Sequence, residues 1–241
     1  MMNRKHSIAA VLAAGLALTA SPALAGGEDG NFMVRVLGTV VHPDTDATVS
    51  TGGAVLAGAD ADVSTEVVPA LTLTYFLTKN VAVELFCCFA RHEVEGEGSL
   101  SALGEIADTW IFPPALTLQY HFDRWGSFKP YVGAGLQYIN FFSEGTGDNR
   151  LGATDVEIDD AVGFTLQAGV DVALGNGWYL NADVKKTWLD TEVTWHNNAL
   201  LAGADVRADV DIDPWLFSVG LGYRFDLADL FGRRAEAAPL K

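Results

Sequence analysis

Residues 161–180 read AVGFTLQAGVDVALGNGWYL, and this stretch decides the fold. Between residues 164 and 174, apolar side chains occupy every even position, whereas Thr165, Gln167, Gly169 and Asp171 occupy odd positions. A period of two indicates a β-strand with one apolar and one polar face. The strand is followed by Gly-Asn-Gly at 175–177, which is typical of a tight turn, and then by a second run of the same kind.

The same pattern fills most of the chain after residue 26, and no segment up to residue 225 keeps the 3.6-residue period of a helix. Each predicted strand is long enough to cross a hydrocarbon layer, which takes about 9 to 11 tilted residues. The predicted strands are residues 32–41, 63–76, 81–94, 109–122, 129–142, 161–174, 178–193 and 206–225.

The connections between these strands alternate in length. Three are short and rich in turn residues, whereas four are long, polar and acidic. The short connections are residues 77–80, 123–128 and 175–177, and the long ones are 42–62, 95–108, 143–160 and 194–205. This alternation predicts an all-β fold: an eight-stranded antiparallel up-and-down transmembrane β-barrel, with short periplasmic turns and longer extracellular loops.

Composition agrees with a barrel in a membrane. The chain is 49% hydrophobic and yet carries a formal net charge of −16. A closed eight-stranded barrel has an interior only wide enough for side chains, so the polar faces fit inside and the continuous apolar faces fit lipid. Nucleic-acid binding is excluded as a function, because phosphate contacts require clustered cations and the chain has none.

The two ends of the chain have separate roles. Arg4 and Lys5 precede an apolar run at 8–20 and the small-residue site Ala-Leu-Ala at 23–25, which together predict a cleaved signal peptide over 1–25. The barrel then covers 26–225, and 226–241 form a C-terminal periplasmic tail. Export of such a chain predicts an outer-membrane protein of a Gram-negative cell.

Neither catalysis nor metal binding is predicted. The pair formed by His92 with Ser99 or Ser101 is the one local arrangement that resembles a lipid-modifying enzyme, and it has no orienting acid beside it. No nucleophile, phosphate-binding or metal motif occurs, and the acidic loops lack the spacing of a calcium loop. We therefore expect no enzyme activity and no cofactor.

Several short motifs resemble those of the OmpW family of outer-membrane proteins, over about residues 31–225. The motifs are NVAVEL (80–85), PPALTLQY (113–120), FKPYVGAG (128–135), QAGVD (167–171), IDPW (212–215) and GYRF (222–225). The resemblance implies a narrow apolar channel that passes small hydrophobic molecules and releases them sideways into the membrane. It also implies outer-membrane lipid, lipopolysaccharide and the barrel-assembly machinery as partners, and leaves the oligomeric state open.

The residues inside the predicted barrel sharpen this expectation. Charged side chains in so narrow an interior must be paired, which favours a salt-bridge network over an ion-conducting path. The network residues are Arg35, Glu84, Asp171, Asp183, Lys185 and Arg224. Phe76 and Phe86 are expected to form an apolar constriction above this polar plug, which directs cargo out through the wall.

Three prolines on predicted strands mark the candidate opening in that wall. Pro69, Pro113 and Pro114 have no N–H to give to a ladder, so they weaken hydrogen bonding between strands toward the loop end. Prolines that merely mark strand ends or bulges give the same pattern. A non-transporting surface barrel, either a receptor or an adhesin, is the alternative function, and a lipid-modifying barrel enzyme is less favoured.

Overall fold

The computed structural model describes residues 30–150 and 152–226. The predicted signal peptide at 1–25, and the predicted tail beyond residue 226, lie outside the described residues. No helix in the described part of the chain is long and apolar enough to cross a membrane.

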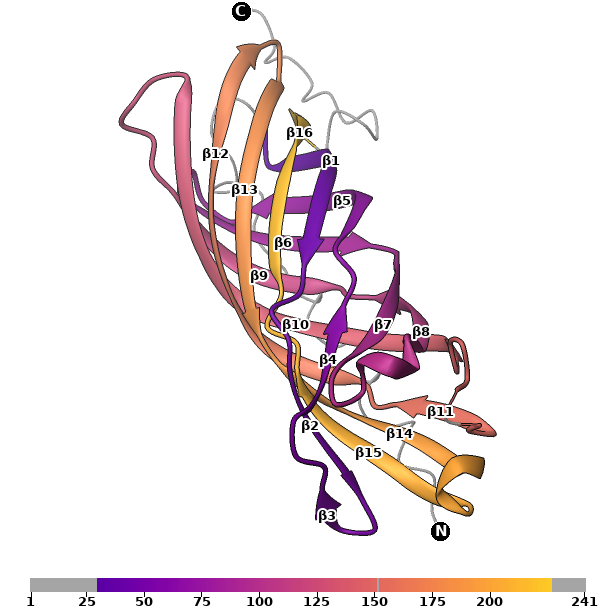
Figure 1. The fold of residues 1–241 in the computed structure, drawn as a ribbon. Coiled ribbons are helices and arrows are strands. Elements are labelled where there is room, and N and C mark those ends of the chain that lie inside the picture. The colour runs from indigo at the N-terminus through magenta and orange to yellow at the C-terminus, as the bar shows by residue number, and fades with distance from the viewer. Residues whose placement is uncertain (1–29, 151, 227–241) are drawn as a thin grey trace, which may run out of the picture.

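The described residues form strands, joined by turns and two short 3₁₀ helices (Figure 1). The 3₁₀ helices are η3 (Ser101–Leu103) and η4 (Ala199–Leu201). The strands are β1 (Phe32–His42), β2 (Asp46–Thr51), β3 (Ala54–Val55), β4 (Ala59–Val63), β5 (Glu66–Phe76), β6 (Val81–Cys88), β7 (Ala90–Gly98), β8 (Glu105–Phe112), β9 (Ala115–His121), β10 (Phe128–Gly145), β11 (Asp155–Ile158), β12 (Ala161–Gly175), β13 (Trp178–Trp188), β14 (Asp190–Asn198), β15 (Ala204–Asp211) and β16 (Trp215–Phe225).

Eight of these strands close into a barrel. Around the ring the order is β1, β5, β6, β9, β10, β12, β13 and β16, and every neighbouring pair is antiparallel. The last strand pairs with the first, from Phe32 opposite Phe225 to His42 opposite Trp215. The prediction of a closed up-and-down barrel of eight strands is therefore confirmed.

The predicted short turns all lie at one end of the barrel. The turn between β12 and β13 has Asn176 and Gly177 at its centre, and both have positive φ angles, 53° and 79°. Two successive positive φ angles define a type I′ hairpin turn, which matches the twist of paired strands and favours Asn-Gly. The Asn-Gly pair in the sequence therefore accounts for the geometry of this turn.

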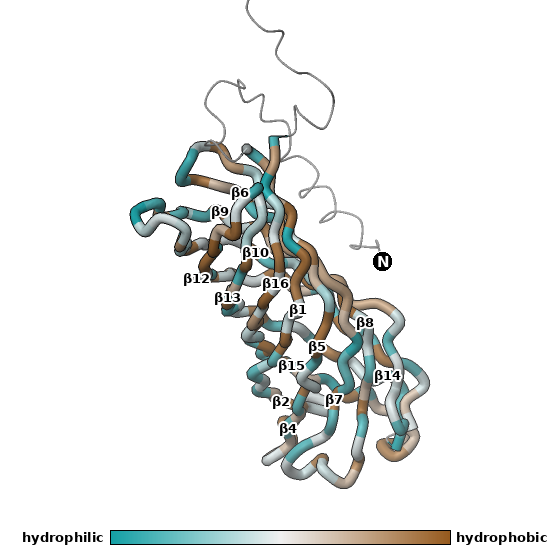
Figure 2. Tube along the Cα trace, turned by 90° about the horizontal axis from the view of Figure 1, so that it is seen from above, coloured by the Kyte–Doolittle hydropathy of each residue, from teal (hydrophilic) through white to brown (hydrophobic). Residues whose placement is uncertain are grey.

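The alternating faces lie as predicted within the barrel. Leu118, Leu166 and Phe217 are about half exposed on the outside, whereas Gln119 and Thr165 are buried inside. Hydropathy accordingly alternates along β12, β13 and β16 (Figure 2). The outer surface of the barrel is thus an apolar belt, and its interior is polar.

The four long connections predicted at the other end of the barrel contain further strands. β2, β3 and β11 lie inside the predicted loops, and β4, β7, β8, β10, β14 and β15 extend into them. The reason is that the period of two continues there with its polarity reversed. Within the predicted loop at 42–62, Ala47 and Val49 are buried, whereas Asp46 and Thr48 are exposed.

These outer strands form two sheets that face each other beyond the belt (Figure 1). One sheet has the order β11, β14, β15, β2, β3, and the other continues from β10 through β8 and β7 to β4. Apolar side chains from both sheets pack into one cluster, which includes Val49, Ala107 and Ala208. The buried Trp195 on β14 donates from its indole Nε1 to the carbonyl of Ile106 on β8, at 2.8 Å. The outer part therefore has an apolar core of its own.

The substitution Ala208→Asp should loosen the outer sheets and leave the membrane barrel intact. Ala208 is completely buried, and an unpaired carboxylate in such a core costs about 3 to 5 kcal/mol. Protease cleavage of the liposome-embedded protein should become faster within β14 and β15. The matched control Asp209→Asn lies on the exposed face and should leave the cleavage rate unchanged, and equal rates for both variants would contradict the core described here.

Candidate functional site

The centre of the barrel holds a layer of paired charges built around Arg35 on β1. The Arg35 guanidinium donates to both carboxylate oxygens of Asp171, from Nε at 3.0 Å and from Nη2 at 2.6 Å. Its Nη1 donates to Glu84 Oε2 at 2.8 Å and to the hydroxyl of Thr74 at 2.6 Å. A bidentate contact of this kind pairs the two opposite charges and also fixes the orientation of the side chains, because the guanidinium is planar.

Lys185 on β13 forms the other half of this layer. Its Nζ lies 2.6 Å from Asp183 Oδ1 and 3.3 Å from Glu84 Oε1, so Glu84 joins the two cations. Two cations thus face three carboxylates, and all five side chains are buried. We call Arg35, Glu84, Asp171, Asp183 and Lys185 the charge layer.

Neutral donors add hydrogen bonds to the carboxylates of the charge layer. Gln167 Nε2 donates to Asp183 Oδ2 at 2.7 Å and to Glu84 Oε1 at 2.9 Å. The Tyr131 hydroxyl donates to Asp183 Oδ2 at 2.8 Å. Tyr131 reaches that position because its ring packs against Gly169, where an added Cβ would lie 2.4 Å from the ring. Buried charges that are paired and fully hydrogen-bonded form a rigid layer rather than a water-filled path.

The predicted network is therefore brought together with one exception. Arg224 lies over the ring of Phe76, with its Cζ 3.6 Å from the ring centroid, and its Nε donates to the carbonyl of Gly30. Phe76 packs with Met33 and Tyr179 near the short-turn end of the barrel. Arg224 and Phe76 thus form a cation–π pair on the short-turn side of the charge layer.

Phe76 and Phe86 do not form one constriction. Phe86 belongs to a second apolar cluster on the loop side of the charge layer, with Leu37 and Leu216, and its ring contacts Lys185 Nζ at 4.8 Å from the centroid. The two rings therefore lie on opposite sides of the charged residues. Sequence alternation placed both inside the barrel, but it could not assign their depth.

Beyond Phe86 lies an apolar chamber that the sequence analysis missed. It is a cavity of about 70 Å³ between the outer sheets and the top of the barrel, and we call it the outer chamber. Its lining includes Val41, Ile111, Ile139, Ile158, Val210 and Leu216. Residue 158 fell in a predicted loop, and the alternation in DVEIDD at 155–160 is the signal that would have found it.

The few polar side chains that line the outer chamber are held by the wall. Thr109 donates its hydroxyl proton to the carbonyl of Trp110 at 3.2 Å, and Thr191 donates to the carbonyl of Asp159. Gln137 donates to the carbonyl of Pro113 and accepts from Thr187. The chamber surface is therefore almost entirely apolar.

The prolines coincide with a break in the barrel wall. The ladder between β6 and β9 ends at Phe86 opposite Ala115, and the ladder between β7 and β8 begins at Ala90 opposite Ile111. Between them, residues 87–89 face residues 112–114 without ladder pairing. We call this stretch the wall seam, and the stacked rings of Phe89 and Phe112, 4.9 Å apart, cover it on the outside.

Pro69 marks a second break on the other side of the same segment. β5 pairs with β6 only up to Ala70 opposite Cys88, and pairing between β4 and β7 begins at Val63 opposite Val94. Residues 65–69 pair with β1 alone or not at all in the ladders of the described strands. Phe89 therefore lacks a ladder partner on both of its edges, and it is 59% exposed.

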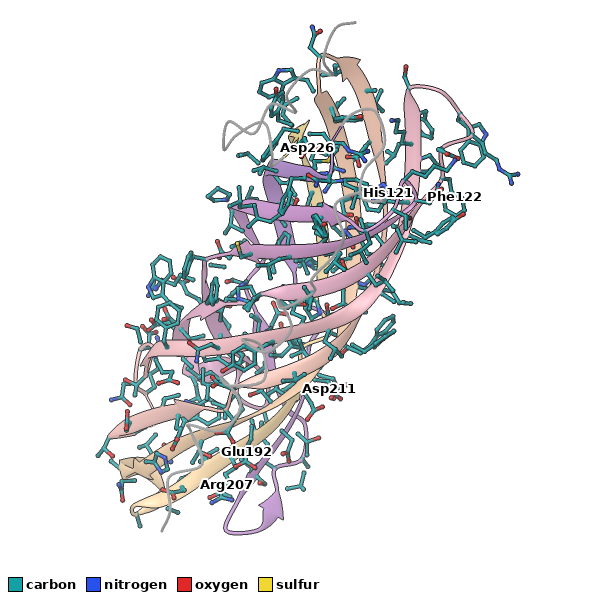
Figure 3. All side chains as sticks on the ribbon, turned by 180° about the vertical axis from the view of Figure 1, so that it is seen from behind. His121, Phe122, Glu192, Arg207, Asp211 and Asp226 are labelled. Carbon is teal, nitrogen blue, oxygen red and sulfur yellow. The ribbon has the colours of Figure 1, made fainter. Side chains whose placement is uncertain are left out.

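The histidine arrangement considered for catalysis does not form. The Nδ1 atom of His92 lies 2.8 Å from the carbonyl oxygen of Ser64, and no hydrogen bond among the described residues joins His92 to Ser99 or Ser101. Acidic side chains gather instead on the outer sheets, where Figure 3 labels Glu192 and Asp211 far from His121 and Phe122. Across residues 30–150 and 152–226, no group of three or more metal-ligating side chains has a geometry that could hold an ion.

Comparison with known proteins identifies the barrel. The model of the OmpW family matches residues 28–225. The chain belongs to the OmpW family. Outer membrane protein W of Vibrio cholerae is 36% identical over 225 residues, which cover 90% of this chain and 96% of that protein. As a member of this family, the protein is located in the outer membrane, and the short-turn end faces the periplasm.

Two solved outer-membrane proteins have a similar fold. The crystal structure of OprG from Pseudomonas aeruginosa is 31% identical with a TM-score of 0.78, covering 84% of this chain and 99% of that chain. The solid-state NMR structure of AlkL in lipid bilayers is 29% identical with a TM-score of 0.66, covering 92% and 98%. These relatives are outer-membrane proteins, in agreement with the predicted location and fold.

The substitution Arg35→Met should strongly destabilise this OmpW-family barrel. It leaves Glu84 and Asp171 buried without their shared cation, and breaking a buried pair in this way costs about 3 to 5 kcal/mol. The free energy of unfolding in urea, measured in lipid vesicles, reports the loss.

Arg91→Met is the matched control, because Arg91 pairs with Asp108 on the exposed outer surface, where the ion pair is screened by solvent, so the free energy of unfolding of this variant should change little. A similar loss for the two variants would show that the charge layer does not stabilise the barrel.

Proposed function

We propose that this protein is a narrow channel that takes up small hydrophobic molecules and releases them sideways into the outer membrane. The observation that carries the proposal is the outer chamber, an apolar cavity closed on the periplasmic side by the charge layer. An apolar solute gains about 25 cal/mol for each Å² of surface that it buries in such a chamber.

The charge layer makes a straight passage to the periplasm unfavourable for an apolar solute. To pass, the solute would have to separate the Arg35–Asp171 and Lys185–Asp183 pairs, whose side chains are almost completely buried. Separated buried charges without water cost several kcal/mol each, whereas an apolar solute offers them no compensating hydrogen bond. The favourable exit is therefore through the wall.

The wall seam is the proposed exit. Opening an intact ladder breaks backbone hydrogen bonds, but residues 87–89 and 112–114 have none between them to break, because Pro113 and Pro114 lack an N–H. The seam lies beside the chamber, since Pro113 lines it, and its outer surface is the exposed Phe89. A solute that displaces the Phe89 and Phe112 rings enters the hydrocarbon of the membrane.

The size of the chamber requires that its walls move during uptake. An engineered protein cavity of about 150 Å³ accommodates benzene, and the outer chamber has about 70 Å³. The structure therefore corresponds to the resting state of the proposed channel, and cargo of the size of benzene or larger enters only when the outer sheets move apart.

Reconstitution into lipid vesicles distinguishes transport from a surface role. Uptake of toluene into the vesicles should be faster with the protein than without it, while ion conductance across planar bilayers should stay low because the charge layer is closed. If the protein neither speeds toluene uptake nor conducts ions, a receptor or adhesin without transport is favoured. Steady ion conductance would contradict the closed charge layer.

The substitution Pro113→Cys should create a lock on the proposed exit. Register places residue 113 opposite Cys88, and both side chains face inwards, so the directly opposed thiols can form a disulfide across the seam. Uptake of toluene should fall several-fold when the variant is oxidised and recover when it is reduced.

The matched control is the double variant Cys88→Ala with Pro113→Cys, which has the same new side chain but cannot form the lock. Its uptake should not respond to oxidant. If the oxidised single variant transports as fast as the reduced one, the exit does not pass through this seam.

A further inference from the structure

One polar atom in the outer chamber has no partner among the described residues: Nε2 of His92. His92 lines the chamber, and the residue as a whole is 4% exposed. Its other nitrogen, Nδ1, lies 2.8 Å from the carbonyl oxygen of Ser64. The side chain is thus anchored to the wall at Nδ1, which leaves Nε2 for the contents of the chamber.

The Ser64 contact fixes which nitrogen carries the proton. A carbonyl oxygen only accepts hydrogen bonds, so Nδ1 must be the protonated donor. Burial lowers the pKa of His92 below its usual value, although the Ser64 carbonyl and Glu66 oppose the shift. The flanking side chains of Arg91 and Glu93 are exposed and charged, so this residue lies beyond the apolar belt. The neutral ring therefore presents an unshared electron pair at Nε2, which accepts hydrogen bonds.

The neighbouring hydroxyl groups add acceptors rather than donors. Thr109 and Thr191 both give their protons to backbone carbonyls, so each presents only oxygen lone pairs to the cavity. A cargo molecule with a hydroxyl group would find an acceptor in this apolar lining. An ether or ketone oxygen in the same place only accepts hydrogen bonds, so it would face the Nε2 acceptor without forming a hydrogen bond.

We propose that the outer chamber prefers apolar molecules that carry a single hydroxyl group, and that Nε2 of His92 accepts a hydrogen bond from that hydroxyl group. This inference rests on the proposed function, because it assumes that cargo occupies the chamber. Its physical basis is that burying a hydroxyl without a partner is unfavourable, whereas one hydrogen bond in a dry site offsets that cost. His92 would then set specificity without taking part in any chemical step.

Nitrogen NMR of the full-length protein in lipid nanodiscs tests the contact directly. Histidine labelled with ¹⁵N gives separate Nδ1 and Nε2 signals, and an Nε2 atom that begins to accept a hydrogen bond shifts its signal. Benzyl alcohol should shift the His92 Nε2 signal, whereas toluene and benzyl methyl ether should leave it in place. An unchanged Nε2 signal with benzyl alcohol would overturn the inference.

Competition between benzyl alcohol and toluene in vesicle uptake gives the second readout. The His92→Phe variant should lower the ratio of alcohol to toluene uptake about fivefold, as expected for one lost hydrogen bond, while toluene uptake itself persists. His196→Phe is the matched control, because His196 lies between Glu157 and Asp205 on the outer sheet, partly exposed, and does not line the chamber.

The outcomes separate this inference from the function on which it rests. If His92→Phe takes up toluene with an unchanged ratio of alcohol to toluene uptake, the channel function stands and the role of His92 is contradicted. Loss of uptake for both solutes in the wild-type protein removes the channel itself, and the preference with it.

Discussion

The buried guanidinium of Arg35 is the interaction on which the interior of this barrel depends. Eight strands enclose a space too narrow for bulk water, so a cation there must find its counter-charges on other strands. Arg35 on β1 binds Asp171 on β12, across the barrel, and Glu84 on β6, two strands away, and Glu84 in turn binds Lys185. These contacts tie β1, β6, β12 and β13 together and close the interior at one level.

On the loop side of the charge layer the strands keep the same two-residue period, but their outer face must be polar instead of apolar. Within the membrane the outside must be apolar, so the polar side chains turn inwards. Beyond the membrane the outside meets water, so charges such as Asp209 turn outwards and Val210 turns in. The change of polarity moves the apolar surface from the outside of the barrel to its inside, and it creates the outer chamber next to the charge layer.

The position of the prolines next to the outer chamber is what supports their proposed role in lateral release. Pro113 and Pro114 lie where the inner face changes from polar to apolar, beside the chamber and at the height of the Phe89–Phe112 stack. At another position, missing ladder hydrogen bonds would only destabilise the wall of the barrel. At this position it connects an apolar cavity to lipid, which is why we propose lateral release rather than passage along the barrel axis.

The sequence by itself determined the number of barrel strands, their alternating faces, the short turns and the presence of paired charges inside, because these follow from local rules of period and turn chemistry. It also placed Pro69, Pro113 and Pro114 at the points where pairing fails. Only the tertiary structure decided the depth of each inward side chain. Alternation tells which face a residue occupies but not its height in the barrel, and the stagger between strands sets that height. For this reason Phe76 and Phe86 lie on opposite sides of the charge layer, Arg224 pairs with an aromatic ring, and segments predicted as loops form the walls of the chamber.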